Sequence, residues 1–188
     1  GLPSEEKYVG RGVSGCATCD GFFYRGREVC VIGGGDSAAE DALFLTKFAG
    51  KVYLVHRRNK LRAISRLQDK LRANGKVEVI YDHILEEVLG EEKVTGVKIR
   101  NVRTGEIRVL AVPGVFIAIG HEPATDIFKR KLNLDDASYI VADDHTRTSV
   151  RGVFAAGDVM DPYYKQAVVA AGAGCKAAIE ALEYLEEI

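Results

Sequence analysis

Two cysteines in the stretch CATCDG (16–21) have a spacing suited to thiol chemistry. Cys16 and Cys19 are separated by two residues, and Asp20 follows directly. Such a pair can be half of a zinc site, a structural disulfide, or a dithiol that cycles between oxidised and reduced forms. The other cysteines and histidines bear on this choice.

A metal site is disfavoured because the remaining ligand types are scattered. A structural zinc ion needs four ligands, usually from a second close pair. Cys30 falls in an apolar stretch, Cys175 in an expected helix, and the 4 histidines occur singly. A permanent CxxC disulfide closes a loop too short to constrain the unfolded chain much. These residues therefore favour a cycling dithiol and no metal, with Asp20 exchanging protons with the thiols. Asp20 also suits a helix N-cap.

A glycine-rich stretch, GGGDSA (33–38), directly follows an apolar run. The pattern Gly33-x-Gly35-x-x-Ala38 fits a dinucleotide-binding loop, in which glycines allow close approach of a pyrophosphate and the small third residue allows helix–strand packing. The helix N-terminus supplies N–H groups to the phosphates. Glycine turns also occur for packing alone, but the position after a strand favours the nucleotide. The expected site comprises Gly33, Gly35, Asp36, Ser37 and Ala38.

A second expected part of this site is the basic stretch HRRNKLR (56–62). NAD-binding folds carry an acid here for the ribose hydroxyls, and this stretch has none. Guanidinium groups match the oxygens of a 2′-phosphate, so we expect NADPH, bound by His56, Arg57, Arg58 and Arg62. A solvated basic surface or a nucleic-acid patch is the alternative. No aromatic residues interleave with the basic ones and the net charge is −1, so nucleic acid is disfavoured.

Alternating strands and helices are expected to position these motifs. Apolar runs at 28–32, 51–55 and 76–81 predict parallel strands, and helical spacing predicts helices at 38–50 and 64–73. This order predicts an α/β fold: a Rossmann-like, doubly wound NADPH-binding domain.

The rest of the chain has a different pattern. Turn signals predict a β-meander at 84–112. Two further strands are predicted at 114–120 and 153–159, and a long helix is predicted at 165–188. We expect an NADPH-binding domain at 1–125 and a second, incomplete domain at 126–188.

Composition narrows the class further. Hydrophobic residues make up 47% of the chain, enough for a real core. No apolar run is long enough for a membrane span and the first residues lack a signal-peptide core, so no membrane association is expected. Four cysteines are too few for a disulfide scaffold, which favours the cytoplasm.

Several segments together resemble bacterial thioredoxin reductases, and the match covers nearly the whole chain. They are GCATCDGFFYRGREVCVIGGGDSAAEDALFL, VHRRNKLRA, FIAIGHEPAT, GVFAAGDV and YYKQAVVAAGAGCKAAIEA. The resemblance implies an enzyme that passes electrons from NADPH through FAD to a Cys16–Cys19 disulfide and on to thioredoxin, as a homodimer. It also implies that Cys19 faces the flavin, Cys16 attacks thioredoxin and Asp20 is the acid–base residue. For the flavin it implies contacts from Gly157, Asp158, Lys165, Gln166 and Ala167.

The sequence departs from the family pattern in three ways. The N-terminal FAD fingerprint is absent, so residues 126–188 are expected to be the C-terminal segment of a split, Rossmann-like FAD-binding domain with an incomplete FAD site. Arg151 replaces a usual proline, and Lys165 replaces a common arginine. Two alternatives remain: the flavoprotein reductase of a peroxiredoxin system, and a non-catalytic NADP-binding module. An intact CATCDG argues against the module.

Overall fold

A computed structural model describes all 188 residues. The chain divides into two compact units, Gly1–Gly120 and His121–Ile188. The expected boundary after residue 125 lies slightly further along the chain. Each unit is described by itself.

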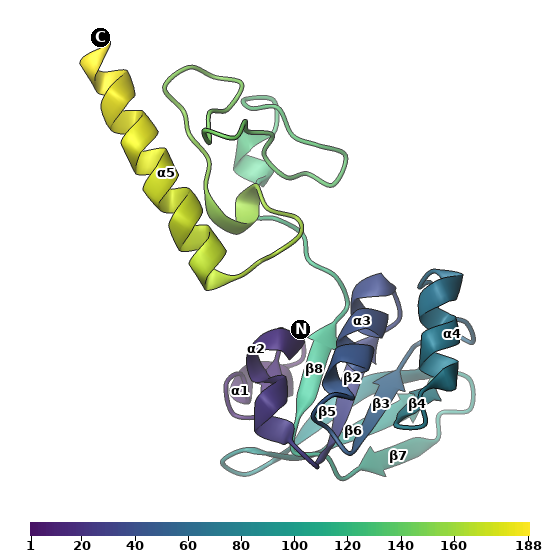
Figure 1. Cartoon of the computed structure of the whole chain (residues 1–188). Helices are drawn as coiled ribbons and strands as arrows, with labels where there is room; N and C mark the ends of the chain where they lie inside the picture. The colour runs from purple at the N-terminus through teal and green to yellow at the C-terminus, as the bar shows by residue number, and fades with distance from the viewer. The chain divides into compact units, whose positions relative to one another are not determined.

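A five-stranded parallel sheet forms the centre of the first unit (Figure 1). Its strands, in spatial order, are β1 (Val13–Ser14), β8 (Val115–Ala118), β2 (Glu28–Gly33), β3 (Lys51–Val55) and β4 (Val77–Ile80). All neighbouring pairs run parallel, with Cys30 beside both Val115 and Tyr53. The strands expected at 28–32, 51–55, 76–81 and 114–120 are therefore confirmed, the last in a shorter form.

Helix α1 (Pro3–Lys7) precedes the strands, and four short helices connect them: α2 (Ala17–Asp20), the 3-10 helix η1 (Gly21–Tyr24), α3 (Asp36–Leu45) and α4 (Ser65–Ala73). The helix expected at 38–50 starts earlier and ends earlier. Gly35 is its N-cap, so Asp36 already lies in the first turn, where its negative charge suits the helix dipole. At the other end the hydroxyl of Thr46 donates to the carbonyl of Leu43 at 2.6 Å, and the chain continues as turns.

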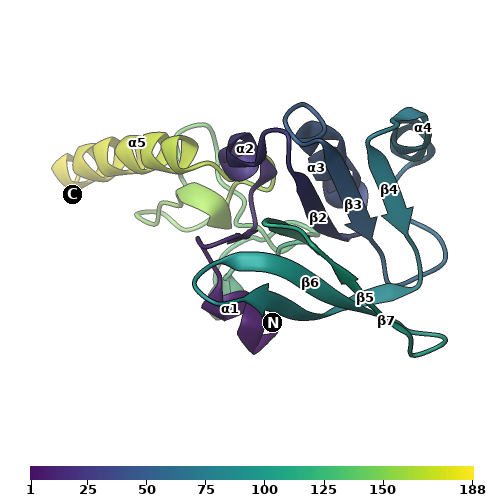
Figure 2. The same cartoon turned by 90° about the horizontal axis from the view of Figure 1, so that it is seen from below.

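The expected meander is also confirmed. Strands β5 (His83–Gly90), β6 (Val94–Asn101) and β7 (Ile107–Leu110) form an antiparallel sheet in that order. Figure 2 shows this sheet on one side of the parallel strands and the helices α2, α3 and α4 on the other.

Alternation along the parallel strands explains these three layers. Val29 and Val31 of β2 belong to a buried cluster with residues of α3 and α4. Cys30, between them, belongs to a second cluster with Val97 and Ile99 of β6. Because successive side chains of a strand point to opposite faces, β2 supplies both cores. The fully apolar run is thus the signature of a strand covered on both sides.

The second unit contains little regular structure apart from one long helix. It has the 3-10 helices η2 (Asp126–Phe128) and η3 (Gly157–Val159), and α5 (Ala167–Glu186), which confirms the helix expected at 165–188. The strand expected at 153–159 is wrong. A strand needs a hydrogen-bonded neighbour, and this segment has only the isolated bridge between Arg147 and Phe154 before it turns into η3.

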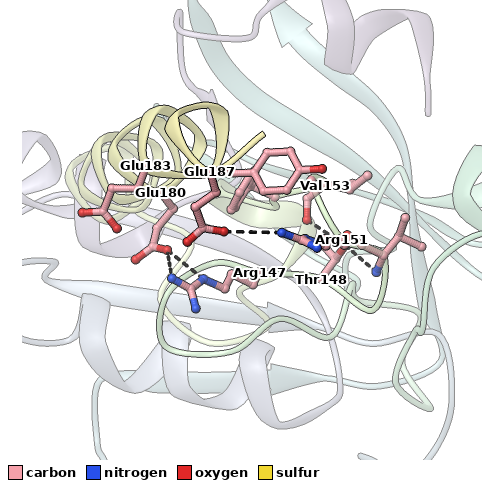
Figure 3. Close-up of a pocket in the computed structure, with 11 residues that line it drawn as sticks. Arg147, Thr148, Arg151, Val153, Glu180, Glu183 and Glu187 are labelled. Atoms are coloured by element: carbon pink, nitrogen blue, oxygen red, sulfur yellow. Dashed lines mark hydrogen bonds and ion pairs between the residues drawn. The ribbon is translucent and has the colours of Figure 1, made fainter.

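A buried carboxylate fastens α5 to the preceding loop. Glu180 is 9% exposed and accepts hydrogen bonds from His145 Nδ1 at 2.5 Å and Arg147 Nε at 2.7 Å. Figure 3 shows Arg147 and Arg151 reaching towards acidic residues of α5, where Arg151 lies 3.5 Å from Glu187. No helix of the structure is both long and apolar enough to cross a bilayer.

Candidate active site

The two cysteines of CATCDG form a disulfide bond, which confirms the pairing that the resemblance implied. Cys16 is the N-cap of α2, and its sulfur accepts the N–H of Cys19 at 3.2 Å. The hydroxyl of Ser14, at the end of β1, accepts the N–H of Cys16 at 3.0 Å. A tight helical turn at the edge of the parallel sheet therefore holds the pair.

The disulfide lies at the surface. Cys19 is exposed and Cys16 is half-buried. Thr18 places its hydroxyl 3.3 Å from the sulfur of Cys16. Asp20 is also half-buried, and although it precedes η1, its side chain makes no capping hydrogen bond. The N-cap role that its residue type suggested is therefore not observed.

Sequence reasoning missed an aromatic pair beside the disulfide. Phe22 and Phe23 are 59% and 74% exposed, and the Arg25 guanidinium lies 5.1 Å from the centre of the Phe22 ring. Gly21 of the same 3-10 turn is buried against α3 and the following turn. Because η1 is a single short turn, it cannot bury two adjacent aromatic side chains. The two consecutive phenylalanines after CATCDG were the signal in the sequence. Exposed apolar surface of this kind marks contact sites for other proteins.

The glycine loop joins β2 to α3 in the manner expected of a nucleotide loop. A Cβ on Gly33 would overlap the Ala118 carbonyl and lie 2.6 Å from the Cβ of Ala38. Ala38 is fully buried, so its small side chain allows the close helix–strand packing. Gly35 is the N-cap of α3, and the space where its side chain would be is open up to the Arg62 guanidinium at 4.0 Å.

The basic stretch 56–62 folds against this loop. The Gly34 carbonyl accepts the N–H groups of Arg62 at 2.7 Å and Ala63 at 3.1 Å. Asp36, at the start of α3, accepts the N–H of Ile64 at 2.8 Å. Backbone hydrogen bonds thus fix the far end of the basic stretch to the glycine loop. Asp36 takes part in this contact, and Ser37 is exposed in the same helical turn.

A cavity of about 380 Å³ lies where the two stretches meet, and its lining includes Gly33, Gly34, His56, Arg57 and Arg62. Arg58 was expected in the site but does not line the cavity. The guanidinium groups of Arg57, Arg58 and Arg62 are exposed, and no salt bridge in the structure involves them. The cavity therefore has two arginines without a salt-bridge partner beside a glycine loop, and the one carboxylate in its lining, that of Glu5, is paired with the amine of Gly1.

The residues expected to contact a flavin lie in the second unit. Gly157 has a φ of +78° at the start of η3, and a Cβ there would lie 3.6 Å from the Cβ of Ala170 in the first turns of α5. Asp158 is exposed in η3, Gln166 is the N-cap of α5, and Ala167 is its first residue.

Lys165 completes this group. It adopts a φ of +48°, and its ammonium lies 5.4 Å from the centre of the Tyr139 ring. The second unit thus brings the η3 turn next to the N-terminus of a 20-residue helix. The cavity that contains Glu180 lies elsewhere in this unit and includes none of these residues.

Comparison with known proteins agrees with this combination of a surface disulfide and a glycine loop. Residues 1–174 match the family described as pyridine nucleotide-disulphide oxidoreductase. The chain belongs to this family. Its place among the pyridine nucleotide-disulphide oxidoreductases is consistent with the layered first unit and with the cysteine pair.

Individual oxidoreductases of this family give a closer comparison. The chain is 55% identical to thioredoxin reductase of Rickettsia conorii over 191 residues, which covers 100% of the chain and 62% of that protein. It is 51% identical to thioredoxin reductase of Streptomyces coelicolor, covering 98% of the chain and 58% of that protein. The crystal structure of thioredoxin reductase from Streptococcus pyogenes superimposes with a TM-score of 0.95 at 46% identity, over 100% of the chain and 62% of that structure. The chain thus spans about three-fifths of the relatives that it matches.

Proposed function

We propose that this chain belongs to a thioredoxin-disulfide reductase that passes electrons from NADPH through FAD to the Cys16–Cys19 disulfide and on to thioredoxin. The observation that carries the proposal is the presence, in one compact unit, of a surface disulfide and a cavity lined by a glycine loop and arginines. A nicotinamide cofactor supplies two electrons, and reduction of one disulfide consumes two.

The residues of the first unit fit NADPH. The N–H groups at the start of α3 face the space left open at Gly35, which suits a pyrophosphate. Arg57 and Arg62 offer charge-assisted bonds to a 2′-phosphate, and Arg58, outside the cavity lining, adds positive charge nearby. Charge that has no internal partner gains more from a bound dianion than charge already paired.

Residues 126–188 are, in this proposal, the C-terminal segment of a split FAD-binding domain. Asp158 would hold polar groups of the FAD, and the N-terminus of α5 at Gln166 and Ala167 would favour negative charge near it. When bound, FAD supplies the step from hydride transfer to thiol chemistry, which the side chains alone cannot perform. These residues would form part of a site only, because the sequence holds a single strand–glycine–helix fingerprint, that of the first unit.

The dithiol then reduces the partner by thiol–disulfide exchange. The Cys16 thiolate attacks the thioredoxin disulfide, forms a mixed disulfide and releases one thioredoxin thiolate. Cys19 displaces the second, which restores the Cys16–Cys19 disulfide and leaves thioredoxin as a dithiol. Asp20 accepts and donates the protons of these steps. The N–H of Cys19 and the Thr18 hydroxyl, both directed at the Cys16 sulfur, favour its thiolate.

The proposal includes a homodimer in the cytoplasm and no interaction with nucleic acid. The flavoprotein reductase of a peroxiredoxin system stays an alternative, because it would use the same dithiol with a different protein disulfide. A non-catalytic NADP-binding module is the second alternative, and it gives no role to the surface disulfide.

Two variants that each retain one cysteine of the Cys16–Cys19 pair test the exchange step without flavin. Both carry Cys175→Ser, because Cys175 is an exposed free thiol, and Cys30 is buried. One adds Cys19→Ser and the other Cys16→Ser. Each is mixed with a thioredoxin that lacks its resolving cysteine. The remaining active-site cysteine of this thioredoxin carries thionitrobenzoate in disulfide linkage as the leaving group. We expect the variant that retains Cys16 to release thionitrobenzoate at least about tenfold faster.

Equal rates in the two variants would contradict the assigned roles of the cysteines. The same measurement with a thioredoxin-like domain of a peroxiredoxin system, labelled in the same way, distinguishes the alternative partner. Faster exchange with that domain than with thioredoxin would favour the alternative.

A further inference from the structure

We infer that His56 is a specificity-determining positioning residue, which ties the turn 57–60 to the glycine loop and so sets where Arg57, next to the separately anchored Arg62, meets a 2′-phosphate. This inference rests on the proposed NADPH site and gives His56, which was expected to bind the nucleotide and lines the cavity, a positioning role that acts through the backbone.

The His56 ring bridges two segments of backbone. His56 is 5% exposed, with Nδ1 3.0 Å from the carbonyl oxygen of Gly33 and Nε2 3.0 Å from that of Lys60. Gly33 ends β2 and precedes the glycine loop, whereas Lys60 lies in the exposed turn between Arg57 and Arg62. One side chain thus connects the pyrophosphate part of the site with its 2′-phosphate part.

The packing around the ring shows that the site is built for an imidazole. A Cβ on Gly34 would overlap the His56 ring, so only glycine leaves room for it there. The Gly34 carbonyl in turn accepts the N–H groups of Arg62 and Ala63. The ring therefore lies against the same peptide that holds the far end of the arginine stretch.

Both partners of the ring are hydrogen-bond acceptors, and this defines what a substitute can do. A neutral imidazole has one N–H group and donates to only one of the two carbonyls at a time, whereas an imidazolium donates to both. Burial lowers the pKa of His56, and Arg62 and Arg58 lower it further, while the two carbonyls oppose this. An asparagine can replace the contact of Nδ1 with Gly33, and a glutamine the contact of Nε2 with Lys60. A leucine has similar bulk and can make neither.

The expected effect falls on the 2′-phosphate rather than on the whole nucleotide. Bidentate contacts of guanidinium groups depend on geometry at the level of fractions of an ångström. Without the bridge, the exposed turn 57–60 has fewer constraints, while the hydrogen bonds from Arg62 and Ala63 to Gly34 keep the glycine loop in place. Selectivity for the phosphorylated cofactor should therefore fall more than affinity for the common part.

The test compares NADP⁺ and NAD⁺, which differ only in the 2′-phosphate, by calorimetric titration of the 188-residue chain. For His56→Leu we expect the ratio of the two dissociation constants to fall at least about tenfold, while the NAD⁺ constant changes by less than about threefold. His56→Asn and His56→Gln should give intermediate ratios. Leu71→Ala, which removes a buried side chain of α4, is the control for lost stability and should keep the unaltered ratio.

The outcomes separate this inference from the function on which it rests. If the unaltered chain binds NADP⁺ and NAD⁺ equally, the proposed cofactor is wrong and the role of His56 fails with it. If the unaltered chain prefers NADP⁺ and a folded His56→Leu variant keeps that preference, the positioning role is overturned and the cofactor site stands. If His56→Leu does not fold, an unchanged ratio in both the Asn and the Gln variants overturns it.

Discussion

Arg57 and Arg58 begin the basic stretch, exposed and without a carboxylate partner, and this favours binding of an added anion. Each charge-assisted contact to the 2′-phosphate should contribute about 1.5–3 kcal/mol. Two or three such contacts predict at least a roughly hundredfold preference of the chain for NADPH over NADH. The double variant Arg57→Ala, Arg58→Ala should lose most of this preference in fluorescence titrations with both cofactors.

A matched control removes the same charge from the neighbouring helix. Arg66→Ala with Lys70→Ala alters exposed residues of α4 that do not line the cavity. This control should keep the preference for NADPH. A loss of preference in the control as large as in the double variant would mean that overall charge, and not a site, selects the cofactor.

The ionised carboxylate of Asp41 in α3 destabilises the fold at neutral pH. Burial, with a smaller contribution from Glu40, raises the pKa of the Asp41 carboxyl to about 6. A pKa raised on folding means that ionisation opposes the folded state, so stability falls as the pH rises through this value. Asp41→Asn should therefore stabilise the chain at pH 7.5 by about 1–2 kcal/mol after allowance for partial solvent screening.

Urea unfolding at two pH values checks this prediction. Below pH 3.8, the ordinary pKa of an aspartate, the carboxyl is neutral in both states, and the variant should have no advantage. Glu40→Gln, one residue earlier and exposed, should give a smaller change. A stabilisation by Asp41→Asn that is equally large at low pH would exclude the ionisation effect.

At the level of elements, the carboxylate of Glu180 joins α5 to both His145 and Arg147. The hydrogen bond from His145 and the charge of Arg147 lower the pKa of Glu180 below its ordinary 4.5. A lowered pKa stabilises the fold above pH 4.5, and this stabilisation is lost as the pH falls through the folded-state value. Glu180→Gln should lower the thermal midpoint at pH 7 by a few degrees.

The pH dependence distinguishes this effect from a general loss of packing. The difference between Glu180→Gln and the unaltered chain should shrink as the pH falls below 4.5 and through the lowered folded-state pKa of Glu180, because the carboxyl then becomes neutral like the amide. Glu183→Gln changes a carboxylate of the same helix that makes no salt bridge and should leave the midpoint nearly unchanged. A difference that persists undiminished at low pH would contradict the ion-pair explanation.

Apolar segments that have hydrogen-bonded strands beside them could be predicted from the sequence, whereas a segment of the same character without a neighbouring strand was predicted wrongly. β2 and β3 are apolar on both faces, and their neighbours lie within the chain, so their pattern predicted them. The segment 153–159 has the same apolar character, but only one bridge partner, and it ends in a 3-10 turn. Hydrophobic periodicity indicates which residues a strand would bury. It does not indicate whether a neighbouring strand is present to pair with it.

The candidate site divides in the same way. CATCDG, the glycine loop and the arginines could be proposed as site residues from the sequence because residue type and spacing indicate their chemistry. The bridging contacts of His56 and the exposure of Phe22 and Phe23 arise from side chains packing against particular backbone groups. Such contacts depend on the folded path of loops, which spacing along the sequence does not specify.

For the whole molecule, the division after Gly120 predicts that nucleotide binding is a property of the first unit alone. All residues that line the candidate cofactor cavity lie between Leu2 and Ile119, and both buried clusters of the layered sheets lie in the same unit. A chain truncated after Gly120 should bind NADP⁺ within about threefold of the affinity of the 188-residue chain. Calorimetry of the two proteins measures this.

Circular dichroism of the truncated chain shows whether it is folded. A folded truncated chain with binding weakened more than about tenfold would mean that residues 121–188 contribute to the cofactor site. Intact binding would establish the first unit as an independent domain.

Because the parallel sheet is covered on both faces, a thiol buried between the two sheets can report transient opening of the first unit. Cys30 lies fully buried between the two sheets, where burial raises the pKa of its thiol, whereas Cys175 is exposed on α5. A maleimide can therefore label Cys175 at any time, but Cys30 only during the moments when the antiparallel sheet separates from the parallel one. With the Cys16–Cys19 disulfide formed, the slow phase of labelling measures the rate at which the two sheets separate. A bound nucleotide that stabilises the first unit will slow this phase.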